Sequence, residues 1–195
     1  KSLPGAILTR VAESHIRVGT FQYIAARQKK DELQILVNYV IKRHFPELDN
    51  KKNKELELLK NVLDRQLDLV VSWMRVGFIH GVMNTDNMSI CGETIDYGPC
   101  AFMDAYDPKT VFSSIDTLGR YAYCNQPMII KWNLARFAEC LIPLIDNDQK
   151  KAIRIATEII NTFEKKYEEK WVLMMKNKLG LIGYNNEDKN LILDL

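Results

Sequence analysis

Hydrophobic residues recur with helical spacing along most of the chain. Between residues 31 and 45 they fall every three or four positions, and His44-Phe45-Pro46 ends the pattern because a residue before proline avoids the α region. A longer amphipathic pattern predicts a helix from about Glu55 to Ile79. Two further helices are expected over 129–145 and 149–178, with Gly180 as the stop signal of the second.

The pattern changes between residues 81 and 127. Two short runs, 88–90 and 94–96, flank Cys91-Gly92-Glu93, which predicts a β-hairpin with a glycine-containing turn. Residues 97–127 are rich in proline, glycine and asparagine and are expected to be irregular, and segments of this kind are usually functional. The predicted fold is therefore mainly α (α+β), helical with one small β-hairpin.

Composition narrows the class of protein. With 195 residues and 47% hydrophobic content, the chain is large enough for one substantial core. Its 27 Lys and Arg nearly balance 25 Asp and Glu and are interspersed, which argues against a nucleic-acid partner. No apolar run is long enough for a membrane span and no signal peptide opens the sequence, so we expect an intracellular protein without a membrane partner.

The predicted hairpin places three oxygen-bearing side chains together. Asp86 and Asn87 stand at the base of one strand and Asp96 at the base of the other, about 5 Å apart if the strands pair. Mg²⁺ prefers hard oxygen ligands, so Asn87 and Asp96 are the expected metal pair, and Asp86 stays free to accept a proton from an attacking hydroxyl. Ordinary turn chemistry is the alternative, because Asp and Asn are common in turns.

Long runs of the sequence resemble the selenoprotein O family, which includes the bacterial YdiU-like proteins. The matching segments are Leu3-Pro4-Gly5-Ala6, Leu8 to Ala12, Ser14 to Gln22, His80 to Ile90, Ile95 to Pro99, Phe102 to Pro108, Gly119 to Ala122, Asn125-Gln126-Pro127 and Trp132-Asn133-Leu134. Family members have a pseudokinase fold, so the resemblance implies a protein-kinase-like C-lobe with the hairpin at its metal site.

The resemblance also implies an activity and a set of site residues. Family members transfer AMP from ATP to Ser, Thr or Tyr hydroxyls of protein substrates (AMPylation), with Mg²⁺ or Mn²⁺. Asp86 matches the catalytic aspartate, Asn87 and Asp96 match the metal ligands, and Arg10 and Arg17 match nucleotide-binding arginines. Arginines seven residues apart would share a helix face and form a phosphate clamp, whereas the alternative is a pair of surface ion pairs.

The family pattern sets two further expectations. A glycine-rich segment and a lysine precede the Leu-Pro-Gly motif in the family, so residues 1–195 are expected to be the C-lobe-like portion of a longer protein, poorly active alone, without its N-terminal nucleotide-binding lobe and C-terminal extension. Its compartment would be the cytoplasm in a bacterium and the mitochondrion in a eukaryote. The alternative functions are a protein kinase-type phosphotransferase and a non-catalytic nucleotide- or partner-binding pseudokinase module.

Overall fold

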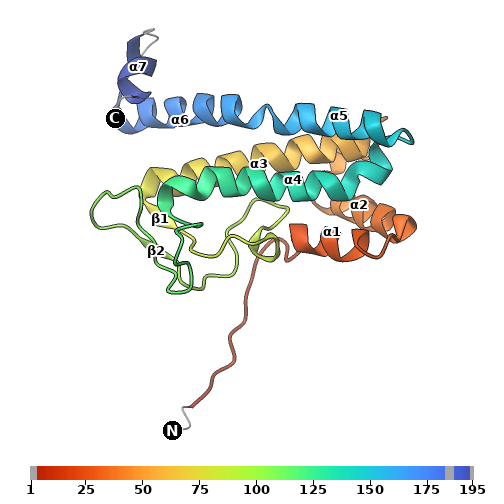
Figure 1. The fold of residues 1–195 in the computed structure, drawn as a ribbon, viewed down its shortest axis with the longest axis horizontal. Helices are drawn as coiled ribbons and strands as arrows, with labels where there is room; N and C mark the ends of the chain where they lie inside the picture. Colours follow the sequence, from red (N-terminus) through yellow and green to blue (C-terminus); the bar gives the residue numbers. More distant parts are fainter. Residues whose placement is uncertain (1–3, 183–186, 194–195) are drawn as a thin grey trace.

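The computed structural model describes residues 4–182 and 187–193, which form layers of helices (Figure 1). The α-helices are α1 (Val18–Ala25), α2 (Lys30–His44), α3 (Lys54–Val76), α4 (Gln126–Ile145), α5 (Gln149–Ile160), α6 (Phe163–Leu179) and α7 (Glu187–Leu193). The central layer is α3 and α4, with α5 and α6 along one side and α1 and α2 along the other. The segment before α1 extends away from this body without regular structure.

Helix α3 lies at the centre because its apolar side chains cover a broad face. Ten of its residues are buried, and Gln66 is the one polar side chain among them. The helix ends three residues earlier than the sequence predicted, since Gly77 adopts the left-handed conformation (φ 69°) and caps its C-terminus. Helix α4 begins three residues earlier than predicted, because Pro127 fits the first helical turn without losing a hydrogen bond.

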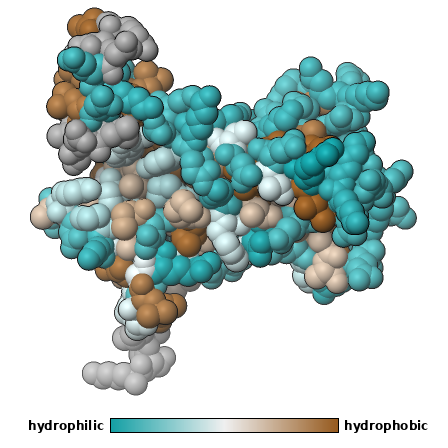
Figure 2. Space-filling model, turned by 45° about the horizontal axis from the view of Figure 1, so that its top comes forward, coloured by the Kyte–Doolittle hydropathy of each residue, from teal (hydrophilic) through white to brown (hydrophobic). Residues whose placement is uncertain are grey.

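The predicted helix over 149–178 is two helices in line, α5 and α6, separated by Asn161 and Thr162. The Thr162 hydroxyl donates to the carbonyl of Ile159, the acceptor that the N–H of Phe163 would use in an uninterrupted helix. The surface seen in Figure 2 is mostly hydrophilic, with hydrophobic residues in separate patches, as expected when the helices bury their apolar faces inward.

A small antiparallel sheet is present, but different residues form it. Strands β1 (Phe78–Ile79) and β2 (Ala101–Phe102) pair, whereas residues 88–90 and 94–96 form no hairpin, so that prediction was wrong. The backbone of residues 88–90 is instead hydrogen-bonded to two residues that are distant in the sequence. The N–H of Ile90 donates to the carbonyl of Ile16 (3.0 Å), and the side chain of Gln66 donates to the carbonyl of Ser89 (2.6 Å).

The mainly helical fold with a small antiparallel sheet is confirmed and is consistent with the helical part of a kinase-like fold. Besides the helices, the described part of the chain has three single 3-10 turns: η1 (Pro46–Leu48), η2 (Thr85–Asn87) and η3 (Tyr123–Asn125). Among the described residues, no helix has the length and apolar character needed to cross a membrane. Segment 97–127 is irregular apart from β2, η3 and the start of α4, as predicted.

Candidate active site

Arg10 and Arg17 converge on the carboxylate of Asp96. Arg17 donates from Nε (3.2 Å) and Nη2 (2.8 Å) to Oδ2 of Asp96, and Arg10 donates from Nη1 to Oδ1. The Asp96 side chain is 17% exposed, against 27% for Arg17 and 58% for Arg10. Each carboxylate oxygen therefore has a guanidinium partner, which is charge-assisted hydrogen bonding in a partly water-excluded position.

The expected helix carrying both arginines is absent, and that part of the prediction was wrong. Arg10 lies in the extended segment before α1, and Arg17 is the N-cap residue of α1. Arg17 is instead positioned by an antiparallel bridge to Ser89, together with a bond from the N–H of Val18 to the carbonyl of Met88 (3.0 Å). The two arginines meet through tertiary contacts and do not share a helix face.

His80 holds the backbone next to Asp96. Its Nε2 is 2.8 Å from the carbonyl oxygen of Ile95, and the N–H of Val82 donates to Nδ1 (3.4 Å). Burial lowers the pKa of His80, so the ring is neutral, with Nε2 as the donor and Nδ1 as the acceptor. Trp73 also holds the segment before Asp96, because its Nε1 donates a hydrogen bond to the hydroxyl of Thr94 (2.8 Å). His80 thus has a structural role beside Asp96.

Asp86 and Asn87 lie in η2, which packs against α1. The first turn of α1 presses on this segment: a Cβ on Gly19 would be 3.3 Å from the Cα of Asp86. Asn87 donates from Nδ2 to the carbonyl of Val82 (2.9 Å), which fixes its amide. Asp86 is exposed, and its carboxylate has no hydrogen bond or ion pair with another described residue. Within the described chain, neither residue bonds to Asp96.

A cavity of about 490 Å³ opens beside the Arg10–Asp96 pair. Its walls are residues 8–12 of the extended segment with His15 on one side, and residues 94–98 on the other. Leu8, Val11 and Ile95 supply apolar wall, while Arg10 and Asp96 supply the charges. An apolar wall with few convergent polar groups is the usual character of a small-molecule site, and 490 Å³ is within the range for such pockets.

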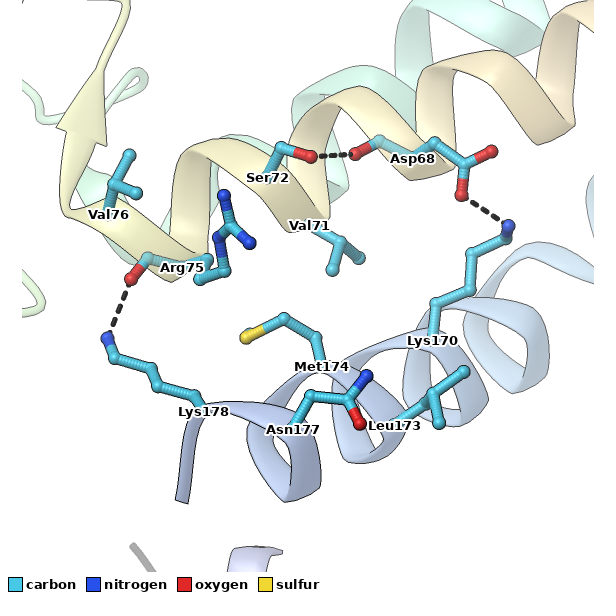
Figure 3. Close-up of a pocket in the computed structure, with 10 residues that line it drawn as sticks. All are labelled: Asp68, Val71, Ser72, Arg75, Val76, Lys170, Leu173, Met174, Asn177 and Lys178. Atoms are coloured by element: carbon cyan, nitrogen blue, oxygen red, sulfur yellow. Dashed lines mark hydrogen bonds and ion pairs between the residues drawn. The ribbon is translucent and has the colours of Figure 1, made fainter. Parts of the chain in front are cut away.

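A larger cavity of about 640 Å³ lies between α3 and α6, away from these residues (Figure 3). Lys170 is paired with Asp68 across it, and Lys178 donates to the carbonyl of Arg75 (2.7 Å). Asp68, Lys170 and Lys178 at its edges already have partners, and its floor is made of ordinary packing residues such as Val71 and Met174. None of the residues that line it belongs to the Asp96 centre.

The oxygen donors suit a hard divalent cation only together with a phosphate ligand. In the described part of the chain, no three His, Cys, Asp or Glu side chains gather as a possible metal group. Asp96 offers a carboxylate, and Asn87 offers an amide oxygen that its bond to Val82 leaves available. One or two protein oxygens plus nucleotide phosphates is the ordinary Mg²⁺ arrangement, so the chemical type of these two donors suits the metal.

Sequence reasoning missed Tyr121 and Gln66. The hydroxyl of Tyr121 donates to Oδ1 of Asn84, the residue that precedes η2, and Gln66 holds Ser89 beside Arg17. These partners are 37 and 23 residues apart, and no local pattern could reveal the contacts. The one available signal was a glutamine on the apolar face of a predicted helix, because a buried polar side chain needs a partner.

The fold is consistent with the helical part of a kinase-like protein, and arginines paired with a carboxylate, as Arg10 and Arg17 are with Asp96, are also a common means of binding phosphate groups. Comparison with known proteins identifies the family. The model of the family described as protein adenylyltransferase SelO matches residues 2–195. The chain belongs to this family.

Similar proteins are found in several bacteria under the name protein nucleotidyltransferase YdiU. The one from Pelagibacter ubique is 66% identical over 98% of this chain and 40% of its own length. Those from Alcanivorax borkumensis and Halalkalibacterium halodurans are 61% and 59% identical over 99% of this chain, covering 40% and 39% of their own lengths. The chain thus spans about 40% of the length of these relatives.

Proposed function

We propose that the protein transfers AMP from ATP to Ser, Thr or Tyr hydroxyls of protein substrates. The convergence of Arg10 and Arg17 on Asp96, at the wall of a cavity large enough for a small molecule, is the observation that supports this most directly. The names of its relatives, which describe nucleotidyl transfer to proteins, support the same reaction class.

Arg10 and Arg17 would bind the phosphates of ATP. A guanidinium group makes paired hydrogen bonds to phosphate oxygens as readily as to a carboxylate, so the two arginines can exchange Asp96 for the nucleotide. Asp96 and Asn87 would then hold Mg²⁺ or Mn²⁺, which, when bound, neutralises charge on the phosphates. The exposure of Arg10, at 58%, leaves its side chain free to make this exchange.

Asp86 would act as the general base. It accepts the proton of the acceptor hydroxyl while the hydroxyl oxygen forms a bond to the α-phosphorus of ATP. The bond between that phosphorus and the oxygen bridging to the β-phosphate breaks, and pyrophosphate leaves. The absence of any partner for the Asp86 carboxylate among the described residues supports this role, because a base must be free to take up a proton.

Mass spectrometry after incubation with ATP and Mg²⁺ tests the reaction. The protein, expressed from its complete reading frame, should add one AMP to a protein hydroxyl. Asp86→Asn should lower this rate by about 10²–10⁴-fold at unchanged KM for ATP, the usual contribution of a general base. A gain of phosphate in place of AMP would identify a kinase, because the hydroxyl would then attack the terminal phosphorus.

We also propose that residues 1–195 act as the C-lobe-like part of a larger catalytic unit. The chain spans about 40% of the length of its relatives, which supports the view that it is one part of a larger protein. Titrating ATP into residues 1–195 and into the product of the complete reading frame would test it. The shorter protein should bind ATP more weakly, and equal affinity would contradict the division.

A further inference from the structure

A small cavity of about 10 Å³ lies between α3, α4 and the segment that carries η2. Residues of all three elements line it, among them Gln66 of α3, Asn133 of α4 and Asn87 of η2. A single buried water needs about 10–15 Å³ of free volume, so the cavity admits one ligand of that size and nothing larger.

Two buried amide side chains line this cavity and each has an oxygen atom to spare. Gln66 and Asn133 are both 0% exposed. Within the described chain, neither Oε1 of Gln66 nor Oδ1 of Asn133 has a hydrogen-bond partner. A buried amide oxygen without a partner is destabilising, so two of them at one cavity predict a ligand that satisfies both.

The hydrogen bonds of the two amide nitrogens fix where the oxygens lie. Nε2 of Gln66 donates to the carbonyl of Ser89 (2.6 Å), and Nδ2 of Asn133 donates to the carbonyls of Met83 (2.9 Å) and Ile129 (3.1 Å). Rotating either amide by half a turn would place its oxygen against a carbonyl oxygen, which is repulsive. The ligand in the cavity therefore faces two hydrogen-bond acceptors.

Water is the ligand that matches two acceptors in a cavity with apolar walls such as Leu69 and Ile130. Its two O–H groups can donate one hydrogen bond to each amide oxygen. A hard metal cation takes about six oxygen ligands, far more than two amides supply. Glu93 is the one charged residue among the described residues that line the cavity, and its carboxylate already accepts from the N–H of Glu13 (2.9 Å).

The same two amides hold both ends of the turn that carries Asp86. Gln66 bonds to Ser89, which follows η2, and Asn133 bonds to Met83, which precedes it. A water bonded to both amides joins α3 to α4 between these two contacts. The separation of the two ends of the turn is then set by the packed helices.

We infer that the cavity binds one structural water, which bridges Oε1 of Gln66 and Oδ1 of Asn133, and that these two side chains are positioning residues for η2. The binding of water is independent of the proposed function. The consequence for catalysis rests on the proposed function, because it requires the roles given to Asp86 and Asn87.

A crystal structure of the protein from the complete reading frame, at a resolution that shows ordered waters, tests the site directly. Electron density should lie about 2.7–3.0 Å from both amide oxygens. Crystals grown with Rb⁺ as the monovalent cation should give no anomalous signal at this position. The absence of density between the two oxygens would overturn the inference, and an anomalous signal there would replace the water by a cation.

Gln66→Met and Asn133→Leu each remove one acceptor at nearly unchanged side-chain volume. Each variant should lose the density, because a buried water needs at least two partners. Backbone amides of residues 84–90 should exchange hydrogen roughly tenfold faster, as expected for about one lost hydrogen bond. Density retained in either variant would contradict the bridge, and unchanged exchange in both would contradict the positioning role.

Asn61→Leu is the matched control, because Asn61 is an amide on α3 that bonds within its own helix, to the carbonyl of Glu57 (2.8 Å). This variant should keep both the density and the exchange rates of the wild type. Faster exchange of residues 84–90 in Asn61→Leu as well would show that any lost amide on α3 has this effect, which would overturn the positioning role.

The rate of AMP transfer gives the functional readout. Asn133→Leu should lower kcat roughly tenfold or more, because misplacing a catalytic group is costly, and should bind ATP without Mg²⁺ as the wild type does. An unchanged kcat would contradict the positioning role. If the wild type transfers no AMP, the proposed function fails, whereas the density and the exchange rates still decide the water site.

Discussion

At the residue scale, Asp96 combines an unusual backbone with two charge partners. Its φ is +57°, a left-handed conformation that non-glycine residues adopt rarely, asparagine and aspartate more often than most. Neighbouring bonds maintain it: the Ile95 carbonyl accepts from His80, and the N–H of Gly98 donates to the Asp96 carbonyl (2.8 Å). Strain that is held in this way is typical of functional sites, and here it fixes the direction of the carboxylate that Arg17 contacts.

The lowered pKa of His80 predicts a loss of stability in mild acid. Burial is the main cause of the shift, and the His80 pKa lies below its ordinary value of 6.5 in the folded protein. As the pH falls below about 6.5, the unfolded chain binds a proton that the folded chain does not, so the free energy of unfolding decreases. Urea denaturation between about pH 8 and about pH 5 should show this decrease.

His80→Gln removes the titrating group and keeps a donor for the Ile95 carbonyl. Its pH dependence should therefore be smaller, with a remainder from His44, whose pKa is also lowered by burial and by Arg43. An unchanged pH profile in this variant would rule out His80 as a source of the acid sensitivity.

At the element scale, the turn after β1 depends on Gly81. Its φ is +82°, and a Cβ there would lie 2.9 Å from Cγ of Pro99. Gly180, at the end of α6, has a similar φ of +71° with no atom within 4 Å of the same position. Gly180→Ala should therefore cost about 1–2 kcal/mol for the backbone alone.

Gly81→Ala should lower the free energy of unfolding by roughly 1–3 kcal/mol more than Gly180→Ala does, because the added Cβ is crowded against Pro99. Chemical denaturation of the two variants measures the difference directly. Equal losses would mean that Pro99 moves aside freely and that this turn is not closely packed.

The elements also show how far sequence reasoning reaches. Helical periodicity predicted α2, α3 and α4 to within three residues, because each buries one apolar face. The hairpin was mispredicted because turn chemistry at Gly92 is local, whereas the partners of 88–90 are Ile16 and Gln66. Arg10 and Arg17 were expected to share a helix face, whereas the structure brings them together on Asp96 through tertiary contacts. The roles given to Arg10, Arg17, Asp86, Asn87 and Asp96 remain predictions.

At the scale of the whole molecule, α6 packs on the central helices with Phe163 as its buried residue, while α5 packs on them with Ala152, Ala156 and Ile160. Phe163 is 1% exposed and stacks on Tyr167, with ring centroids 6.3 Å apart, and Tyr167 stacks in the same way on Trp171. Lys166 pairs with Asp64 of α3 (2.7 Å), but both side chains are partly exposed, so this ion pair adds little. Phe163 is therefore the buried anchor of α6, with Tyr167 and Trp171 packed beside it.

Phe163→Ala should lower the free energy of unfolding by about 3–5 kcal/mol, the usual cost of removing a buried ring. Hydrogen exchange should accelerate first in α5 and α6 if the layer loosens as a unit. Ile153→Ala on α5 is the control, because Ile153 is 47% exposed, and its loss should stay below about 1 kcal/mol. Similar losses in both variants would show that Phe163 does not anchor the layer.

The nucleotide site can be tested most directly by calorimetric titration of ATP, with and without Mg²⁺, into the protein from the complete reading frame. Mg²⁺ should strengthen ATP binding to the wild type and to Asp86→Asn. In Asp96→Asn, which tolerates the left-handed backbone, this strengthening should disappear. Arg17→Ala should weaken ATP binding roughly tenfold or more in either condition, as expected for a lost charge-assisted contact. If Asp96→Asn binds ATP with the same affinity and Mg²⁺ dependence as the wild type, the Asp96 centre is not the nucleotide site.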